Sequence, residues 1–296
     1  MQYLLLLSFL LVILVAGNNT SAVSGTLIGS RMVGRYYGLL MTAVGYVAGY
    51  LIEGQFLKKA VSVLLPFPPE VVIYAILASF IIFVVAFFVK VPLSLTMALV
   101  GSSIGLSLKY GVNLPKSFLL SIFVAWILAP IISVVLSYYL NVVMSGKNYG
   151  NIWKYASAVK LLLIFTALFT AFTLGANTIG FIGNVIGFNT ENNIVIVAAV
   201  FLGTFMFSSG VMKSVSQNMY MLKYTNAFTS QIVSALAVEV STLFSIPMSN
   251  TQTLTSSVLG AGLSYKAKAI YLRPFLYIVV MWIISPILGL VLTYVL

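Results

Sequence analysis

Small polar residues interrupt apolar stretches at two places, Asn18-Asn19-Thr20-Ser21 and Gly175-Ala176-Asn177-Thr178. At membrane depth, polar backbone must be bonded within the protein or line a cavity, so helices broken by such residues are typical of binding sites. A half-helix that starts at a break presents free N–H groups and a positive dipole end, which favours an anion. We predict an anion site at both places. The alternative is helix packing through small residues.

A second pair of polar segments begins at a proline, at residues 92–96 and 247–251. Proline fits the first turn of a helix, and the Ser and Thr hydroxyls that follow it lie beside free N–H groups. Hydroxyl and amide donors can coordinate an oxyanion without a full positive charge. Helix caps near the membrane surface are the alternative. The predicted oxyanion-binding residues are Asn18, Asn19, Thr26, Ser94, Thr96, Asn177, Thr178, Ser249, Asn250 and Thr251.

The acidic residues number four, all of them glutamates, and the chain has no aspartate, histidine or cysteine. The chain therefore lacks the residue types that the usual transition-metal sites, a Ser-His-Asp triad and a disulfide framework require. No ATP-binding G-x-x-x-x-G-K-[ST] motif is present. We expect no enzyme, no cofactor and no metal site.

Glu239 stands inside the apolar run 228–246, where an ionisable group is costly and is by default a functional candidate. We predict that it carries a coupling proton, with Glu53 as the second candidate. A carboxyl near a helix end, or a neutral packed one, is the alternative.

These residues must be positioned by membrane helices, because 61% of the chain is apolar, 6% is charged and the mean hydropathy is +1.12. Nearly uncharged runs such as 71–89, 118–140 and 275–296 are each about as long as the roughly 20 residues that cross a bilayer as a helix. The runs are continuous rather than alternating, so we predict an all-α, multi-pass protein of the cell membrane. The basic residues behind the net charge of +11 lie between these runs. We interpret them as loop charges that orient the protein in the lipid bilayer, and we expect no nucleic-acid partner.

The chain contains an internal duplication. Three segments recur in the same order at a nearly constant spacing: 5–20 matches 162–178, 91–110 matches 246–265, and Trp-x-x-x-Pro at 126–130 matches 282–286. We predict two transmembrane repeats, 1–145 and 146–296, with broken or re-entrant helices. Residues 1–17 resemble a signal peptide, but they lack a basic start and recur in mid-chain, so we expect them to form a helix that is not removed.

The two repeats are predicted to be inverted. Arg31 and Arg35 follow the first polar segment, whereas the corresponding loop at 188–193 carries no basic residue, so the two loops should face opposite sides of the membrane. Such repeats are characteristic of secondary transporters, in which one half rocks against the other around a central site. A homo-oligomer is compatible with the sequence.

The paired motifs and their order resemble the inorganic phosphate transporter (PiT) family over nearly the whole chain. The halves of that family carry G-A-N-D-V-A-N-x-x-G and P-V-S-T-T-H. Asn18 and Asn177 match the family asparagines, while Asn19 and Thr178 stand where the family has aspartate. Further neutral replacements are Met97 and Gln252 for the histidines and Gln231 for a glutamate.

The resemblance implies a secondary transporter of phosphate, coupled to a cation. The family carboxylates are thought to hold the coupling ion, so their neutral replacements put sodium coupling in doubt and favour protons, with Gln231 as a further coupling-ion position beside Glu239 and Glu53. The same replacements resemble the sulfate-permease branch of the family. Sulfate has no proton to donate to a carboxylate and would be repelled by it, so a donor-only site suits sulfate as well as phosphate. A proton-coupled sulfate permease and an anion channel are the two alternative functions.

Overall fold

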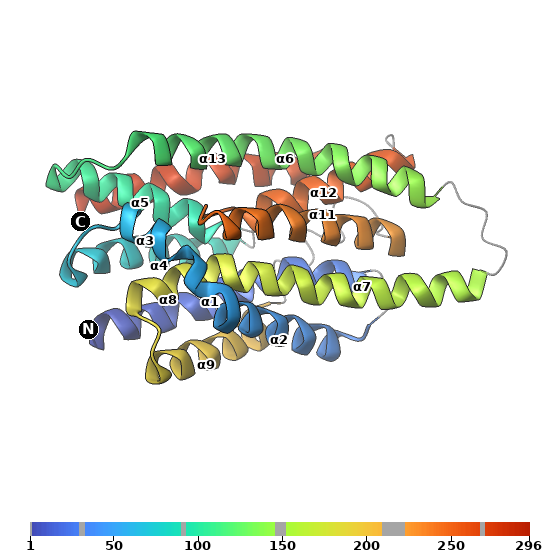
Figure 1. Cartoon of the computed structure of the whole chain (residues 1–296), viewed down its shortest axis with the longest axis horizontal. Coiled ribbons are helices and arrows are strands. Elements are labelled where there is room, and N and C mark those ends of the chain that lie inside the picture. Colours follow the sequence, from blue (N-terminus) through green and yellow to red (C-terminus); the bar gives the residue numbers. More distant parts are fainter. Residues whose placement is uncertain (1, 30–32, 90–92, 146–151, 209–222, 267–269) are drawn as a thin grey trace.

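The computed structural model describes the chain except for residues 1, 30–32, 90–92, 146–151, 209–222 and 267–269. The described residues form a bundle of helices elongated along one axis (Figure 1). Six of the described helices are long and apolar enough to cross a membrane. The predicted all-α transmembrane bundle is therefore confirmed. Pro92, from the first proline motif, lies outside the described residues. The predicted boundary between the repeats, at residues 145 and 146, borders the undescribed segment 146–151.

The elements of the first half are α1 (Gln2–Gly29), α2 (Arg35–Glu53), η1 (Gly54–Leu57), α3 (Lys58–Leu64), α4 (Pro69–Val89), α5 (Leu95–Tyr110) and α6 (Lys116–Ser145). The second half contains α7 (Ile152–Leu174), η2 (Gly175–Ile179), α8 (Gly180–Ile186), α9 (Thr190–Phe207), α11 (Tyr224–Leu243), α12 (Asn250–Lys266) and α13 (Leu272–Val295). Corresponding helices run in opposite directions along the bundle: α1 opposes α7, and α6 opposes α13 (Figure 1).

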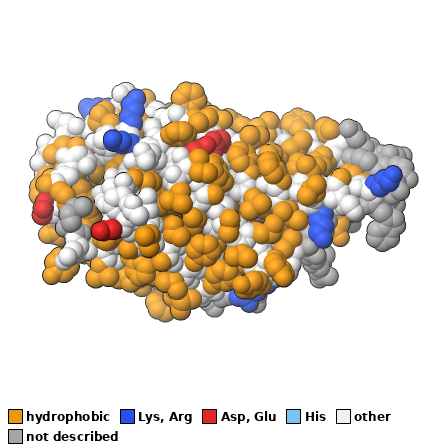
Figure 2. Space-filling model, turned by 60° about the horizontal axis from the view of Figure 1, so that its bottom comes forward, with side chains coloured by type: hydrophobic (Ala, Val, Ile, Leu, Met, Phe, Trp, Pro, Cys, Tyr) orange, Lys and Arg blue, Asp and Glu red, His pale blue; other side chains and the backbone are white. Residues whose placement is uncertain are grey.

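Helices of one half pack on helices of the other. Helix α1 packs against α9 as α7 packs against α2, and α5 packs against α13 as α12 packs against α6. The long outer helices α6 and α13 expose many of their apolar side chains, as a lipid-facing surface requires. Apolar side chains cover most of the face seen in Figure 2, and the basic side chains lie mostly toward the two ends.

The predicted break at Asn18–Ser21 is wrong, because α1 continues without interruption from Gln2 to Gly29. The hydroxyl of Thr20 donates to the Ala16 carbonyl, and that of Ser21 donates to the Gly17 carbonyl. These bonds one turn back along the helix give the polar side chains partners without opening the backbone.

The second predicted break is a wide helical turn instead. The π-helical turn η2 follows α7 directly and continues into α8, so this polar segment also remains helical. A π-helical turn inside an α-helix is frequent at functional sites. Neither polar segment therefore offers the free N–H groups of a broken helix, and any bound anion must rely on side chains and on the starts of α5 and α12.

Helix α2 lies in backbone contact with α7 and η2. A Cβ added to Gly49 would lie 1.8 Å from the Phe172 carbonyl oxygen, and one added to Gly175 would lie 1.9 Å from the Tyr46 carbonyl oxygen. Only residues without a side chain permit this approach, as at other small-residue helix crossings in membranes. The crossing presses Tyr46 against the polar turn η2.

Candidate functional site

Two asparagines hold the two Ser/Thr segments in the same way. The side-chain oxygen of Asn18 accepts a hydrogen bond from the backbone N–H of Leu93 at 3.1 Å. The side-chain oxygen of Asn177 accepts one from the backbone N–H of Met248 at 3.0 Å. In each half, the asparagine thus fixes the residue that directly follows the motif proline.

The Ser and Thr side chains of the two segments repeat the same geometry. The hydroxyls of Ser94 and Thr96 lie 2.9 Å apart, and those of Ser249 and Thr251 lie 3.0 Å apart. Each serine also accepts from the backbone N–H three residues later, at 3.3 Å in both cases. These serines are therefore helix caps, as the alternative interpretation held, but buried caps rather than caps at the membrane surface.

The two segments meet each other inside the bundle. The Thr96 hydroxyl donates to the Met248 carbonyl oxygen at 3.1 Å, and the Trp126 indole donates to the Pro247 carbonyl oxygen at 3.0 Å. The Asn177 side-chain nitrogen donates to the Thr242 hydroxyl at 2.9 Å. The start of α5 therefore contacts the segment that leads into α12, next to the two asparagines.

Helix α11 joins this region to α1 through Gln231. Its side-chain nitrogen donates to the Val23 carbonyl oxygen at 3.0 Å and to the Thr26 hydroxyl. Asn250 is less available to a ligand, because its side-chain oxygen accepts from the Ser234 hydroxyl at 2.8 Å.

The ten predicted oxyanion-binding residues are all buried, with at most 4% of any of them exposed, and none carries a charge. Three nearby amide oxygens, those of Asn19, Gln231 and Gln252, are buried without a hydrogen-bond partner among the described residues. Buried polar atoms are normally paired, so atoms left over in one region indicate room for a polar ligand or ordered water. The region is therefore neutral and rich in hydroxyl and amide groups.

Two of the four glutamates meet outside this network. The carboxyl group of Glu239 on α11 lies within hydrogen-bond reach of the carboxyl group of Glu53 at the end of α2. Each of them has one oxygen that is buried without a partner among the described residues. The described residues contain no group of three His, Cys, Asp or Glu side chains that could hold a metal ion.

Sequence reasoning missed Tyr46 and Thr242. Tyr46 is fully buried, and its hydroxyl lies beside the side chains of Asn19 and Thr178. A tyrosine inside an apolar run is commonplace in a membrane helix, and neither residue belongs to a repeated motif. Only the glycine spacing around Tyr46, at Gly45 and Gly49, signalled a close helix crossing.

Comparison with known proteins gives consistent matches over the whole chain. The model of the phosphate transporter family matches residues 15–293. A Methanocaldococcus jannaschii protein assigned as a phosphate permease is 28% identical over 98% of this chain and 95% of its own length. The Bacillus subtilis sulfate permease CysP is 23% identical over 95% of this chain and 83% of its own.

One solved structure shares the fold. A protein described as the sodium-dependent phosphate transporter superposes with a TM-score of 0.83, covering 100% of this chain and 99% of that chain. Its sequence identity of 15% limits this likeness to the architecture.

Proposed function

Because the chain belongs to the phosphate transporter family, we propose that it is a secondary transporter that carries inorganic phosphate across the membrane. The observation that carries the proposal is a matched pair of hydrogen bonds, from Leu93 to Asn18 and from Met248 to Asn177, which supports one buried polar site made from equivalent parts of the two proposed repeats. The name of the permease from Methanocaldococcus jannaschii supports phosphate as the substrate.

The chemistry of the site suits a tetrahedral oxyanion. Four hydroxyls, those of Ser94, Thr96, Ser249 and Thr251, lie at the buried starts of α5 and α12. Helix N-termini add partial positive charge there. Neutral donors held in fixed positions can bind an anion through hydrogen bonds without a full positive charge.

The arrangement of the helices suits alternating access. Corresponding helices run in opposite directions, and each half packs its helices on those of the other (Figure 1). In inverted-repeat transporters, the substrate lies at the repeat interface, and one half rocks against the other around it. We assign this motion to the halves 1–145 and 146–296.

Sulfate is the second candidate substrate. The residues at the family carboxylate positions are neutral here, namely Asn19, Thr178 and Gln231, so the site lacks a carboxylate that would repel a fully ionised anion. The sulfate permease CysP among the relatives supports this alternative.

Coupling to protons through Glu239 and Glu53 is the mechanism we favour. Import of a dianion against a negative-inside potential costs about 2.3 kcal/mol per charge per 100 mV, so a cation must offset it. Two carboxyl groups in contact repel each other when both are ionised, and we assign to this pair the proton that transport would load and release. Sodium, the ion in the name of the structural neighbour, is the competing partner.

Counterflow tests the carrier directly. Proteoliposomes loaded with unlabelled phosphate and diluted into a trace of labelled phosphate should transiently accumulate label above its equilibrium level, since a carrier exchanges one anion for another. The same assay with sulfate ranks the two substrates. With the membrane potential clamped at zero, an anion channel, the function of another class, would let label equilibrate without overshoot.

A further inference from the structure

Tyr46 lies at the point where the two halves contribute their polar segments. Its backbone packs on Gly175, the first residue of η2, and its side chain is 0% exposed. The hydroxyl lies beside Asn19 of α1 and Thr178 of η2, one residue from each half. Tyr46 is therefore a buried polar group between the two predicted anion-binding segments.

The Tyr46 hydroxyl lies within reach of the side chains of Asn19 and Thr178, but among the described residues it makes no hydrogen bond of good geometry. The side-chain oxygen of Asn19 is also buried without a partner. A buried tyrosine hydroxyl usually finds a partner, and leaving one unsatisfied costs free energy. Two such atoms from neighbouring residues indicate that the partner is a ligand of the site.

We propose that the Tyr46 hydroxyl donates a hydrogen bond to the bound oxyanion. The inference rests on the proposed function and adds a ligand that the repeated motifs do not contain. A phenol remains neutral near pH 7, so it can donate to a dianion without the repulsion that a carboxylate at this position would exert. The side chain is fully buried, and the backbone of Tyr46 packs on Gly175, so the hydroxyl is already held in place before an anion binds.

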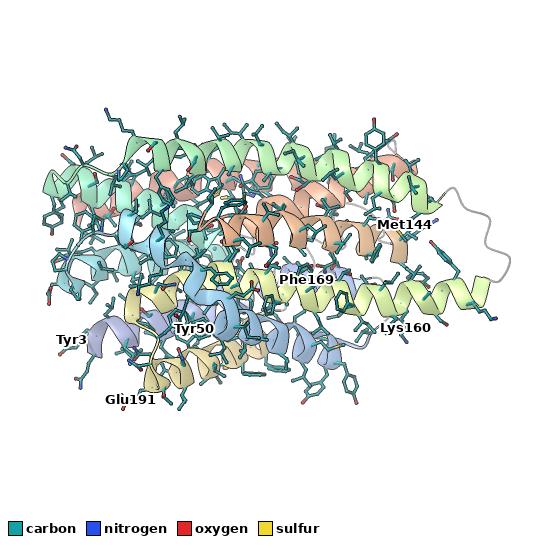
Figure 3. The ribbon with its side chains drawn as sticks, viewed as in Figure 1. Tyr3, Tyr50, Met144, Lys160, Phe169 and Glu191 are labelled. Carbon is teal, nitrogen blue, oxygen red and sulfur yellow. The ribbon has the colours of Figure 1, made fainter. Side chains whose placement is uncertain are left out.

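The substitution Tyr46→Phe removes the hydroxyl alone, and Tyr50→Phe is its matched control. Tyr50 lies one turn further along α2, is also buried, and stacks on Phe188 with ring centroids 5.1 Å apart. Its hydroxyl already has a protein partner, because it donates to the Asn193 side-chain oxygen at 2.6 Å. Tyr50 lies toward the end of the bundle that carries Glu191 (Figure 3).

The experiment measures thermal unfolding of the purified protein in detergent, without added anion and with increasing inorganic phosphate or sulfate. Without anion, Tyr46→Phe should unfold at the same temperature as the parent or higher, since it loses an unsatisfied donor. Its apparent affinity for the oxyanion should fall about tenfold or more, because a hydrogen bond to a charged group is lost. Tyr50→Phe should unfold at a lower temperature and keep the parent's affinity.

The outcomes separate the inference from the function on which it rests. Parent-like affinity in Tyr46→Phe would overturn the inference alone, and so would a lower unfolding temperature without anion, because it would show that the hydroxyl has a partner within the protein. A parent protein that neither phosphate nor sulfate stabilises would contradict the proposed function, and the inference with it.

Discussion

Asn177 accepts a hydrogen bond from the backbone N–H of Met248 at 3.0 Å and thereby ties the π-helical turn η2 to the start of α12. The equivalent bond in the first half, from Leu93 to Asn18, measures 3.1 Å. A substitution at either asparagine therefore acts on a segment whose hydroxyls we assign to the substrate, as well as on the asparagine itself.

Asn18→Ala and Asn177→Ala should each weaken oxyanion binding. Loss of a buried acceptor leaves a backbone N–H unpaired, at a cost of about 1 to 3 kcal/mol, and frees the hydroxyl segment that it held. Isothermal titration with phosphate and sulfate measures the change. Asn141→Ala is the control, because Asn141 links α6 to α12 through Ser264 at 2.6 Å, outside the proposed site. Unchanged affinity in both site variants would rule out the assignment.

Ser94→Ala and Ser249→Ala should each reduce affinity by about 0.5 to 1.5 kcal/mol, and by up to roughly 3 kcal/mol if the hydroxyl contacts the anion directly. Each should also destabilise its helix by about 1 kcal/mol, because both serines are caps. Titration calorimetry measures the change in affinity, and scanning calorimetry measures the change in stability. Ser121→Ala is the control, because the Ser121 hydroxyl donates to the Phe118 carbonyl oxygen within α6 and belongs neither to a helix cap nor to the proposed site. A loss of stability with full affinity would make these serines caps only.

Glu239→Gln should abolish the acceleration of uptake by an inward proton gradient in sodium-free vesicles, while equilibrium exchange continues. In this account the Glu239–Glu53 pair takes up a proton together with the anion outside and must release it inside before the empty carrier returns, and an amide can neither take up nor release a proton. Glu70→Gln, at the exposed start of α4, should respond to the gradient like the parent. Accumulation driven by a sodium gradient alone would contradict proton coupling.

Gly49→Ala should destabilise the protein by about 1 to 3 kcal/mol, because the added methyl group would lie 1.8 Å from the Phe172 carbonyl oxygen and force α2 away from α7. Thermal unfolding measures the effect. At Gly34 an added Cβ meets nothing within 4 Å, so Gly34→Ala should change stability little. Equal unfolding temperatures for the two variants would contradict the close crossing of α2 and α7.

Hydropathy and repeated motifs were sufficient to predict the all-α membrane fold and the family, both of which are confirmed. The helix breaks were predicted wrongly because Thr20 and Ser21 bond back to the preceding turn, a local choice that composition does not reveal. The position of Tyr46 depends on how α2 packs against α7, and the contact between Glu53 and Glu239 depends on where the end of α2 meets α11, neither of which a single sequence specifies. The roles of the site residues stay predictions.

Driven uptake into proteoliposomes tests the central claim most directly. The parent protein, reconstituted with an imposed proton gradient and no sodium, should accumulate labelled phosphate or sulfate above equilibrium with saturation, and Asn177→Ala should raise the concentration needed for half-maximal uptake. The claim of a secondary transporter would be contradicted if either anion entered without saturation and never exceeded its equilibrium level. It would also be contradicted if neither anion entered under a proton or a sodium gradient.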